Sequence, residues 1–271
     1  MGAWDIYEDR LSAHGKTKRE ASYIREVRFI NNRLPDNLSY TTVDIYPGKY
    51  SYNIDSAETG SHCLSQNVAI INSDNLNEKT IISMPEEDIT LGSLVFWMDN
   101  YWLVTERDAN TTIYTKAKLL QCNHLLKWIV GDQTIIEQWC VVEDGTKYLT
   151  GELEDRNFIV TRGDSRISVQ IAKNAYTDAL DRECRFLIDD DDSPHKLSYQ
   201  LTKPLKKGLV YNGDGTYKFV LQEVTATEFD NHELGIADYY HHFPKVVDDK
   251  ISAIQDGEQP PGRLNGKKVW I

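Results

Sequence analysis

The most concentrated source of chemistry in this chain is a run of four carboxylates. Asp189, Asp190, Asp191 and Asp192 follow one another in a segment with the polar character of a loop. Calcium takes several oxygen ligands, which makes the run a candidate cation site. The run lacks the central glycine and the closing glutamate of an EF-hand. The pattern therefore favours a solvated loop that the repulsion between its own charges keeps extended.

The remaining carboxylates offer general acids and bases without marking out a pair. A glycosidase needs two carboxylates that face each other across a cleft, one of them with a raised pKa. Glu143, Asp144, Glu152, Glu154 and Asp155 could supply such groups, but acidic residues are abundant throughout this chain. The sequence contains no nucleophile elbow, phosphate-binding loop or His-Glu-x-x-His motif. It predicts no catalytic residue and no cofactor.

Soft metal ligands are equally sparse. Cys122 and His124 lie on the same side of a predicted strand, but two ligands do not make a zinc site. The four cysteines include no Cys-x-x-Cys pair, and the apolar runs around them favour buried thiols over disulfides or metal ligands. His241 and His242 follow two tyrosines, which favours an aromatic packing or interface patch. No metal site is predicted.

Charge and composition narrow the classes of function. The 271 residues carry a formal net charge of −12, with a sequence pI near 5.0, so the surface as a whole repels nucleic acid. No apolar run has the length of a membrane span or the form of a signal peptide. We expect a protein without a membrane partner that stays in the cytosol until it is assembled.

One helix is predicted with unusual clarity, over residues 17–34. Thr17 and Glu20 have the spacing of a capping box at its start, and Pro35 ends it. An apolar stripe runs along one side of the helix through Tyr23, Val27, Ile30 and Leu34. Arginines occupy the other sides, where a solvated surface is favoured over a basic face that meets nucleic acid or an acidic partner.

The rest of the ordered chain is predicted to be mainly β. Aromatic and β-branched runs over 93–97 and 101–105 flank the tight turn at Met98, Asp99 and Asn100, which is typical of a hairpin. Further hairpins are expected over 40–54, 125–142 and 208–224, and strands over 68–71, 79–83, 112–122 and 166–172. The predicted fold class is therefore mainly β, with small β-barrel or sandwich units and an N-terminal helix.

Four segments are expected along the chain. They are a helical segment over 1–37, a first β-barrel-like unit over 38–145, a second β-rich unit over 146–247 and a flexible tail over 248–271. Residues 185–202 repeat the layout of 94–105, with an apolar strand, an Asp-led tip and a returning strand. This repetition suggests an internal duplication of one small barrel.

The chain also resembles a family of structural proteins encoded by tailed bacteriophages and prophages of Gram-positive bacteria. The resemblance covers most of residues 4–244. The segments that carry it are 4–7, 66–74, 92–105, 114–117, 122–123, 147–151, 161–167 and 185–190. The hairpin at 93–105 is similar to the small β-barrels of head-closure, or stopper, proteins in the phage neck.

The resemblance implies a non-enzymatic virion protein that forms a homo-oligomeric ring between the portal or adaptor and the tail. The loops at Met98 to Asn100 and Asp189 to Asp192 are then candidate interface or channel loops, passing close to packaged DNA at most transiently. Two candidate docking segments follow, one formed by Tyr23, Val27 and Ile30 and the other by Lys268, Val269 and Trp270.

Two alternatives stay open. Within the virion, the protein could be a tail-completion, tail-tip or baseplate component. From another class, it could be a carbohydrate-binding or hydrolytic surface module. The second alternative needs tryptophans that line an exposed cleft, so the positions of Trp97, Trp102, Trp128 and Trp139 discriminate.

Overall fold

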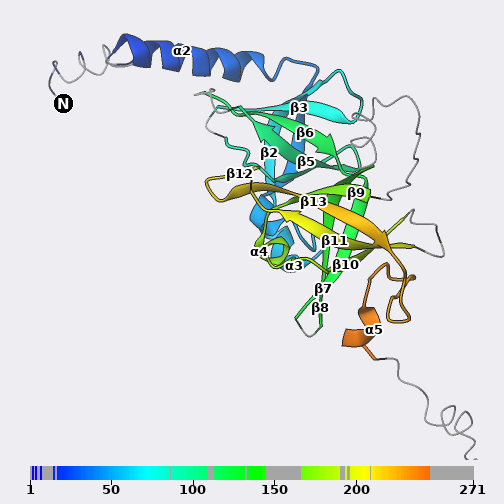
Figure 1. The fold of residues 1–271 in the computed structure, drawn as a ribbon. Coiled ribbons are helices and arrows are strands. Elements are labelled where there is room, and N and C mark those ends of the chain that lie inside the picture. The colour runs from blue at the N-terminus through cyan, green and yellow to red at the C-terminus, as the bar shows by residue number, and fades with distance from the viewer. Residues whose placement is uncertain are drawn as a thin grey trace, which may run out of the picture.

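The computed structural model describes residues 17–85, 87–108, 113–131, 133–144, 166–189, 193, 196–207 and 209–244, together with residues 2, 4, 7 and 15. The fold is mainly β, as the sequence predicted, with two barrel-like sheets stacked along one direction and a helix that projects from one end (Figure 1).

Helix α2 (Lys18–Arg33) begins and ends where the sequence predicted. The Thr17 side chain accepts a hydrogen bond from the Glu20 backbone N–H, and the Glu20 side chain accepts one from the Thr17 N–H. Leu34 is the C-cap and Pro35 follows it. No residue of α2 is buried, so local capping rather than packing on the barrels defines this helix.

The first sheet is a closed barrel in which the strands follow the order β1-β2-β3-β6-β5-β4. All of its pairings are antiparallel, and β4 returns to β1 to close the ring. Inside lie apolar residues from every strand, together with Ile89 from the connection between β3 and β4. The strands are β1 (Tyr40–Tyr46), β2 (Leu64–Asn72), β3 (Glu78–Ser83), β4 (Leu94–Trp97), β5 (Asn100–Arg107) and β6 (Lys116–Gln121).

The second sheet repeats this topology. Its order is β7-β8-β9-β13-β11-β10, so each strand takes the place of its counterpart in the first barrel, with the short β12 paired to β13 as an addition. Leu180, from the connection between β9 and β10, joins its core as Ile89 joins the first. The strands are β7 (His124–Val130), β8 (Thr134–Asp144), β9 (Arg166–Ala172), β10 (Arg185–Ile188), β11 (Leu197–Leu205), β12 (Val210–Tyr211) and β13 (Asp214–Val224).

The shared order gives the predicted echo between two hairpins a structural meaning. The β4–β5 and β10–β11 hairpins occupy equivalent positions in the two sheets. They differ at the closing strand, because β1 pairs with β4 through hydrogen bonds whereas β7 and β10 lie in contact without a paired register. The second sheet is thus barrel-like, but β7 and β10 do not close it through a paired register of hydrogen bonds.

Two expectations differ from the observed strands. Residues 50–54, predicted as a strand, instead follow the 3₁₀ turn η1 (Gly48–Tyr50) and precede the short helix α3 (Ala57–Gly60). This segment packs on the second barrel, where Tyr52 forms an isolated bridge with Gln138. In addition, the sheet changes between β6 and β7, not at residue 145, because β8 pairs with β9.

A buried polar network joins the two barrels. The Nε2 atom of Gln138 donates to Ser51 Oγ and to the Ala172 carbonyl, both at 3.1 Å. Its Oε1 accepts from Asn174 Nδ2 at 2.8 Å. Ser51 lies on the connection after β1, whereas Gln138 and Ala172 belong to β8 and β9 of the second sheet and Asn174 follows β9. Gln138 is fully buried, so each of these bonds replaces one lost to water.

Apolar and backbone contacts complete this junction. Leu94 and Leu103 of the first barrel share a small buried cluster with Cys122, Val141 and Ala172. The backbones also meet directly. A Cβ added at Gly92, where φ is +77°, would lie 2.1 Å from the carbonyl oxygen of Gly215 in β13. Only glycine fits such an approach.

Candidate functional site

The β4–β5 hairpin tip is a tight two-residue turn, as predicted. Met98 and Asp99 have φ values of 49° and 58°, which matches the left-handed conformation that such turns need. Asn100 Nδ2 donates to the Met98 carbonyl at 2.7 Å, which braces the turn. The Met98 side chain is 71% exposed. The tip therefore presents an apolar side chain to solvent on a rigid support.

The predicted acidic loop and tail are only partly described. Asp189 follows β10 and is half-buried, whereas Asp190, Asp191 and Asp192 lie outside the described residues. The docking segment at Lys268, Val269 and Trp270 also lies outside them. The structure therefore brings no carboxylates of this loop together into a described site.

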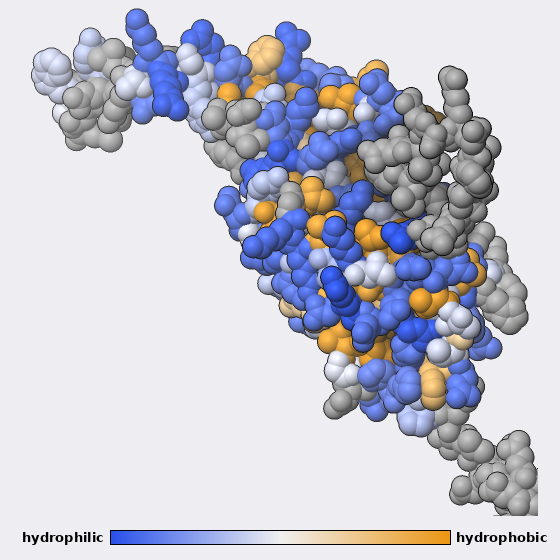
Figure 2. Space-filling view, viewed as in Figure 1, coloured by the Kyte–Doolittle hydropathy of each residue, from blue (hydrophilic) through white to orange (hydrophobic). Residues whose placement is uncertain are grey.

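Helix α2 presents the other predicted docking segment. Tyr23 is 42% exposed, and Val27 and Ile30 are only half-buried. Phe29, on a different side of the helix, is 58% exposed and lies beneath the Arg33 guanidinium. On the face seen in Figure 2, hydrophilic residues cover most of the helix and apolar ones appear towards its junction with the body. The helix exposes both its apolar stripe and its basic residues.

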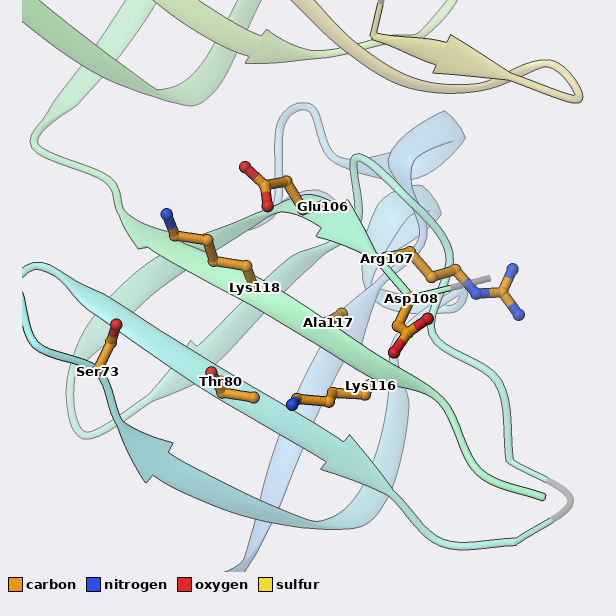
Figure 3. Close-up of a pocket in the computed structure, with 8 residues that line it drawn as sticks. All are labelled: Ser73, Thr80, Glu106, Arg107, Asp108, Lys116, Ala117 and Lys118. Carbon is orange, nitrogen blue, oxygen red and sulfur yellow. The ribbon is translucent and has the colours of Figure 1, made fainter. Parts of the chain in front are cut away.

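A shallow pocket of about 250 Å³ lies on the outer face of the first barrel, over β3, β5 and β6. Figure 3 shows Lys116 and Lys118 beside Glu106, Arg107 and Asp108 around it. Several of these charges already serve the fold. Lys118 binds Glu78 at 2.9 Å and lowers the pKa of that carboxyl, and Arg107 binds Asp88 at 2.6 Å. The pocket is a mixed-charge surface, not a site selective for one charge.

A larger groove of about 840 Å³ lies between the barrels. Leu91 and Thr105 form its wall on the first barrel, and Leu209, Val210 and Tyr211 form the opposite wall beside β12. Tyr211 is 62% exposed. Polar and charged residues, among them Glu106, Arg107 and Asp214, line the groove together with these apolar ones. The residues that line it do not form a constellation of catalytic side chains.

Sequence reasoning missed an ion-pair network around Arg185 on β10. Its guanidinium donates to both carboxylate oxygens of Asp230, at 3.0 and 2.8 Å, and to Asp238 at 2.7 Å. Burial alone would raise the pKa of Asp230, but the N–H groups of Asp238 and Thr227 and the guanidinium hold that pKa below its usual value. The network ties the segment 225–244 to the second barrel. Asp230 and Asp238 lie 45 and 53 residues after Arg185 in sequence, so no local spacing reveals the network.

That segment carries a group of aromatic rings, which we call the aromatic platform. Phe229 stacks on His241 with ring centroids 3.8 Å apart, and Tyr239 stacks on Phe243 at 4.7 Å. Tyr240 meets Tyr239 edge to face at 5.3 Å. Tyr239, Tyr240 and His241 belong to the short helix α5 (Tyr239–His242), and Phe243 follows it. His241 is exposed and the other rings are half-exposed, which agrees with the predicted aromatic patch.

The four discriminating tryptophans are all engaged in packing. Trp102 and Trp128 are 4% exposed, in the first and second cores respectively. Trp97 packs against the first core, and Trp139 stacks on Tyr101 at the junction with centroids 4.9 Å apart. These four side chains do not form an exposed row for stacking on sugar rings.

The described residues offer little to a metal or to redox chemistry. No group of three or more His, Cys, Asp or Glu side chains among them is placed to hold a metal ion. Cys122 and Cys140 are buried, and burial raises the pKa of the Cys140 thiol to about 12, so it stays protonated. Cys63 and Cys184 are half-buried free thiols. Within the described part of the chain, no helix is long and apolar enough to cross a membrane.

In comparisons with known proteins, no family model, no curated protein and no solved structure matched the chain.

Proposed function

We propose that the protein is a non-enzymatic structural component of a tailed-bacteriophage virion. In this role it acts in the head-to-tail connector, as one subunit of a ring between the portal and the tail. The observation that carries the proposal is helix α2, which is well capped yet has no buried residue. A 16-residue helix held away from the body with an exposed apolar stripe is suited to binding another subunit.

The rest of the architecture supports an assembly role. The two barrels are joined by a buried polar network and a shared apolar cluster, which hold them in a fixed orientation relative to each other. The rigid hairpin tip at Met98 and Asp99 is a candidate loop for a neighbouring protein or the channel. An overall charge of −12 suits a channel that passes DNA without binding it, because binding by counterion release needs basic side chains.

Helix α2 and the buried tryptophans also bear on the two alternative functions. A tail-completion, tail-tip or baseplate role fits the helix equally well and differs only in the partner. A carbohydrate-binding or hydrolytic module is favoured less, because Trp102 and Trp128 are buried in the two cores.

The test is the mass of the purified protein in solution, measured alone and with portal protein by sedimentation. Portal-dependent formation of a ring supports the connector role. A matched variant, Val27→Asp with Ile30→Asp, keeps the barrels intact and should lose binding if α2 mediates it. If the wild type ignores the portal but binds tail protein, the connector assignment is overturned in favour of the tail.

A further inference from the structure

The charge of the chain is divided unevenly between helix α2 and the rest. Residues 18–33 contain Lys18 and four arginines against two glutamates, a net charge of +3. Because the whole chain carries −12, the remainder carries −15. The projecting helix is therefore a basic stretch of an acidic protein, and none of its residues is buried.

The aromatic platform has the opposite character. The segment 225–244 contains four acidic residues and neither lysine nor arginine. Arg185 neutralises part of the charge of Asp230 and Asp238, whereas Glu228 and Glu233 of the same segment are exposed. Half-exposed aromatic rings in a segment with exposed carboxylates complement an apolar face flanked by arginines.

The two surfaces lie at opposite ends of the molecule (Figure 1). Helix α2 extends from the first barrel, whereas the platform lies beyond the far end of the second. A helix cannot reach the platform of its own chain across two barrels. Surfaces that differ and lie at opposite ends produce heterologous, head-to-tail contacts, which close into a ring when the rotation allows.

We propose that helix α2 of one copy docks on the aromatic platform of a second copy. Tyr23, Val27 and Ile30 lie against the rings of Phe229, Tyr239 and Phe243. The half-buried Ile24 lies beside the stripe and widens the apolar face of the helix. Arg19 lies one helical turn before Tyr23 and Arg28 one turn after Ile24, so the two arginines lie on either side of this widened face and reach Glu228 and Glu233. This proposal rests on the ring-forming role proposed above and names the surfaces that join its subunits.

The test uses sedimentation of the full chain at low ionic strength, where surface charge pairs are least screened. The helix variant carries Arg19→Glu and Arg28→Glu, and the platform variant carries Glu228→Lys and Glu233→Lys. Each should lower the apparent association constant at least about a hundredfold, because like charges then face each other. The control, Lys18→Glu with Arg25→Glu, changes the net charge as much as the helix variant does. It acts on the side of the helix about 180° from the stripe and should associate like the wild type.

Recombining the changes gives the sharpest result. A mixture of the helix and platform variants, and a single chain carrying all four changes, should both associate again, because opposite charges face each other in each case. The proposal is overturned if the control loses association as the helix variant does, if mixing restores nothing, or if the wild type binds the portal ring only as separate monomers. In that last case portal binding still supports the connector role. Association with the predicted pattern but no binding to portal would remove the connector role and leave the docking of copies standing.

Discussion

The Arg185 guanidinium holds two distant parts of the chain together, and its partner Asp230 is buried with it. Asp230 has no exposed side-chain surface and Arg185 only 13%. Removing one member of a buried pair leaves the other charge without compensation, at a cost of about 3–5 kcal/mol. We expect Asp230→Asn to lower the free energy of unfolding by about 3 kcal/mol, because Asp238 still binds the guanidinium.

A matched control separates burial from charge. Asp181 pairs with Lys206 at 3.4 Å, and its side chain is 83% exposed. Asp181→Asn should therefore cost less than about 1 kcal/mol. Urea denaturation of both variants measures the difference, and equal destabilisation would show that the Arg185 network contributes no more than a surface pair.

The same carboxylate predicts a dependence of stability on pH. The folded-state pKa of Asp230 lies below its unfolded value. Between these two pKa values the unfolded state binds more protons, so the stabilisation is complete above about pH 4 and is lost as the pH falls further. When the pH is lowered from 5, the urea midpoint of the wild type should therefore decrease by more than that of Asp230→Asn. Parallel losses in the two proteins would contradict the assignment.

Gly92 makes a prediction about the junction between the barrels. A methyl group there would collide with the Gly215 carbonyl and also occupy a left-handed backbone position. Gly92→Ala should cost about 3 kcal/mol or more, at the upper end for single substitutions. Gly213→Ala, with φ of +93° and open space around it, isolates the backbone strain and should cost about 1–2 kcal/mol. Thermal denaturation that gives the two variants equal midpoints would rule out the close approach.

At the scale of elements, helix α2 should be the least protected regular structure in the isolated chain. A helix of 16 residues without tertiary packing is marginal in water, and its capping box adds only about 1 kcal/mol. Amide hydrogens of α2 should exchange much faster than those of β9, which lies within the second sheet. Assembly of copies should slow exchange in α2 alone. Exchange in the monomer as slow as that of β9 would mean that the helix is already packed.

Elements with local signals could be predicted from the sequence, and elements that depend on distant partners could not. Thr17 and Glu20, three residues apart, mark the start of α2, and Pro35 follows its C-cap. The 93–105 hairpin carries its turn and both strands together. Residues 50–54 alternate like a strand, but their pairing partner is Gln138 in another sheet. The change of sheet after β6 has no turn signal of its own, whereas the sequence at 144–145 is Asp-Gly, which is typical of a turn and drew the expected boundary there.

The candidate surfaces follow the same division. The exposed tip at Met98 and the stripe on α2 were visible in the residue pattern, because each lies within one element. The aromatic patch near His241 was also indicated by its neighbours. The Arg185 network and the groove beside Tyr211 were not, since both form only when the second barrel folds.

At the scale of the whole molecule, the repeated strand order raises the question of whether the barrels unfold separately. Each has its own core, which by itself would allow two transitions. The junction argues against this, because Gln138 binds Ser51 on the connection after β1 as well as Ala172 in β9. In addition, Leu94 and Leu103 share a buried cluster with Val141 and Ala172 of the second sheet. Opening the junction would leave buried polar groups without hydrogen-bond partners, at a cost of about 1–3 kcal/mol each. We therefore expect the barrels to unfold together.

Trp102 lies in the first core and Trp128 in the second, so replacing either one removes part of the fluorescence signal of that core. In urea, the fluorescence transitions of Trp102→Phe and Trp128→Phe should each coincide with their own far-ultraviolet circular dichroism transitions of the strands. Gln138→Ala leaves Asn174 and Ser51 without this partner, so it should weaken the coupling and separate the transitions. If the fluorescence and circular dichroism transitions separate while Gln138 is intact, the barrels are independent domains. A ring subunit would then have a hinge at the junction between the barrels.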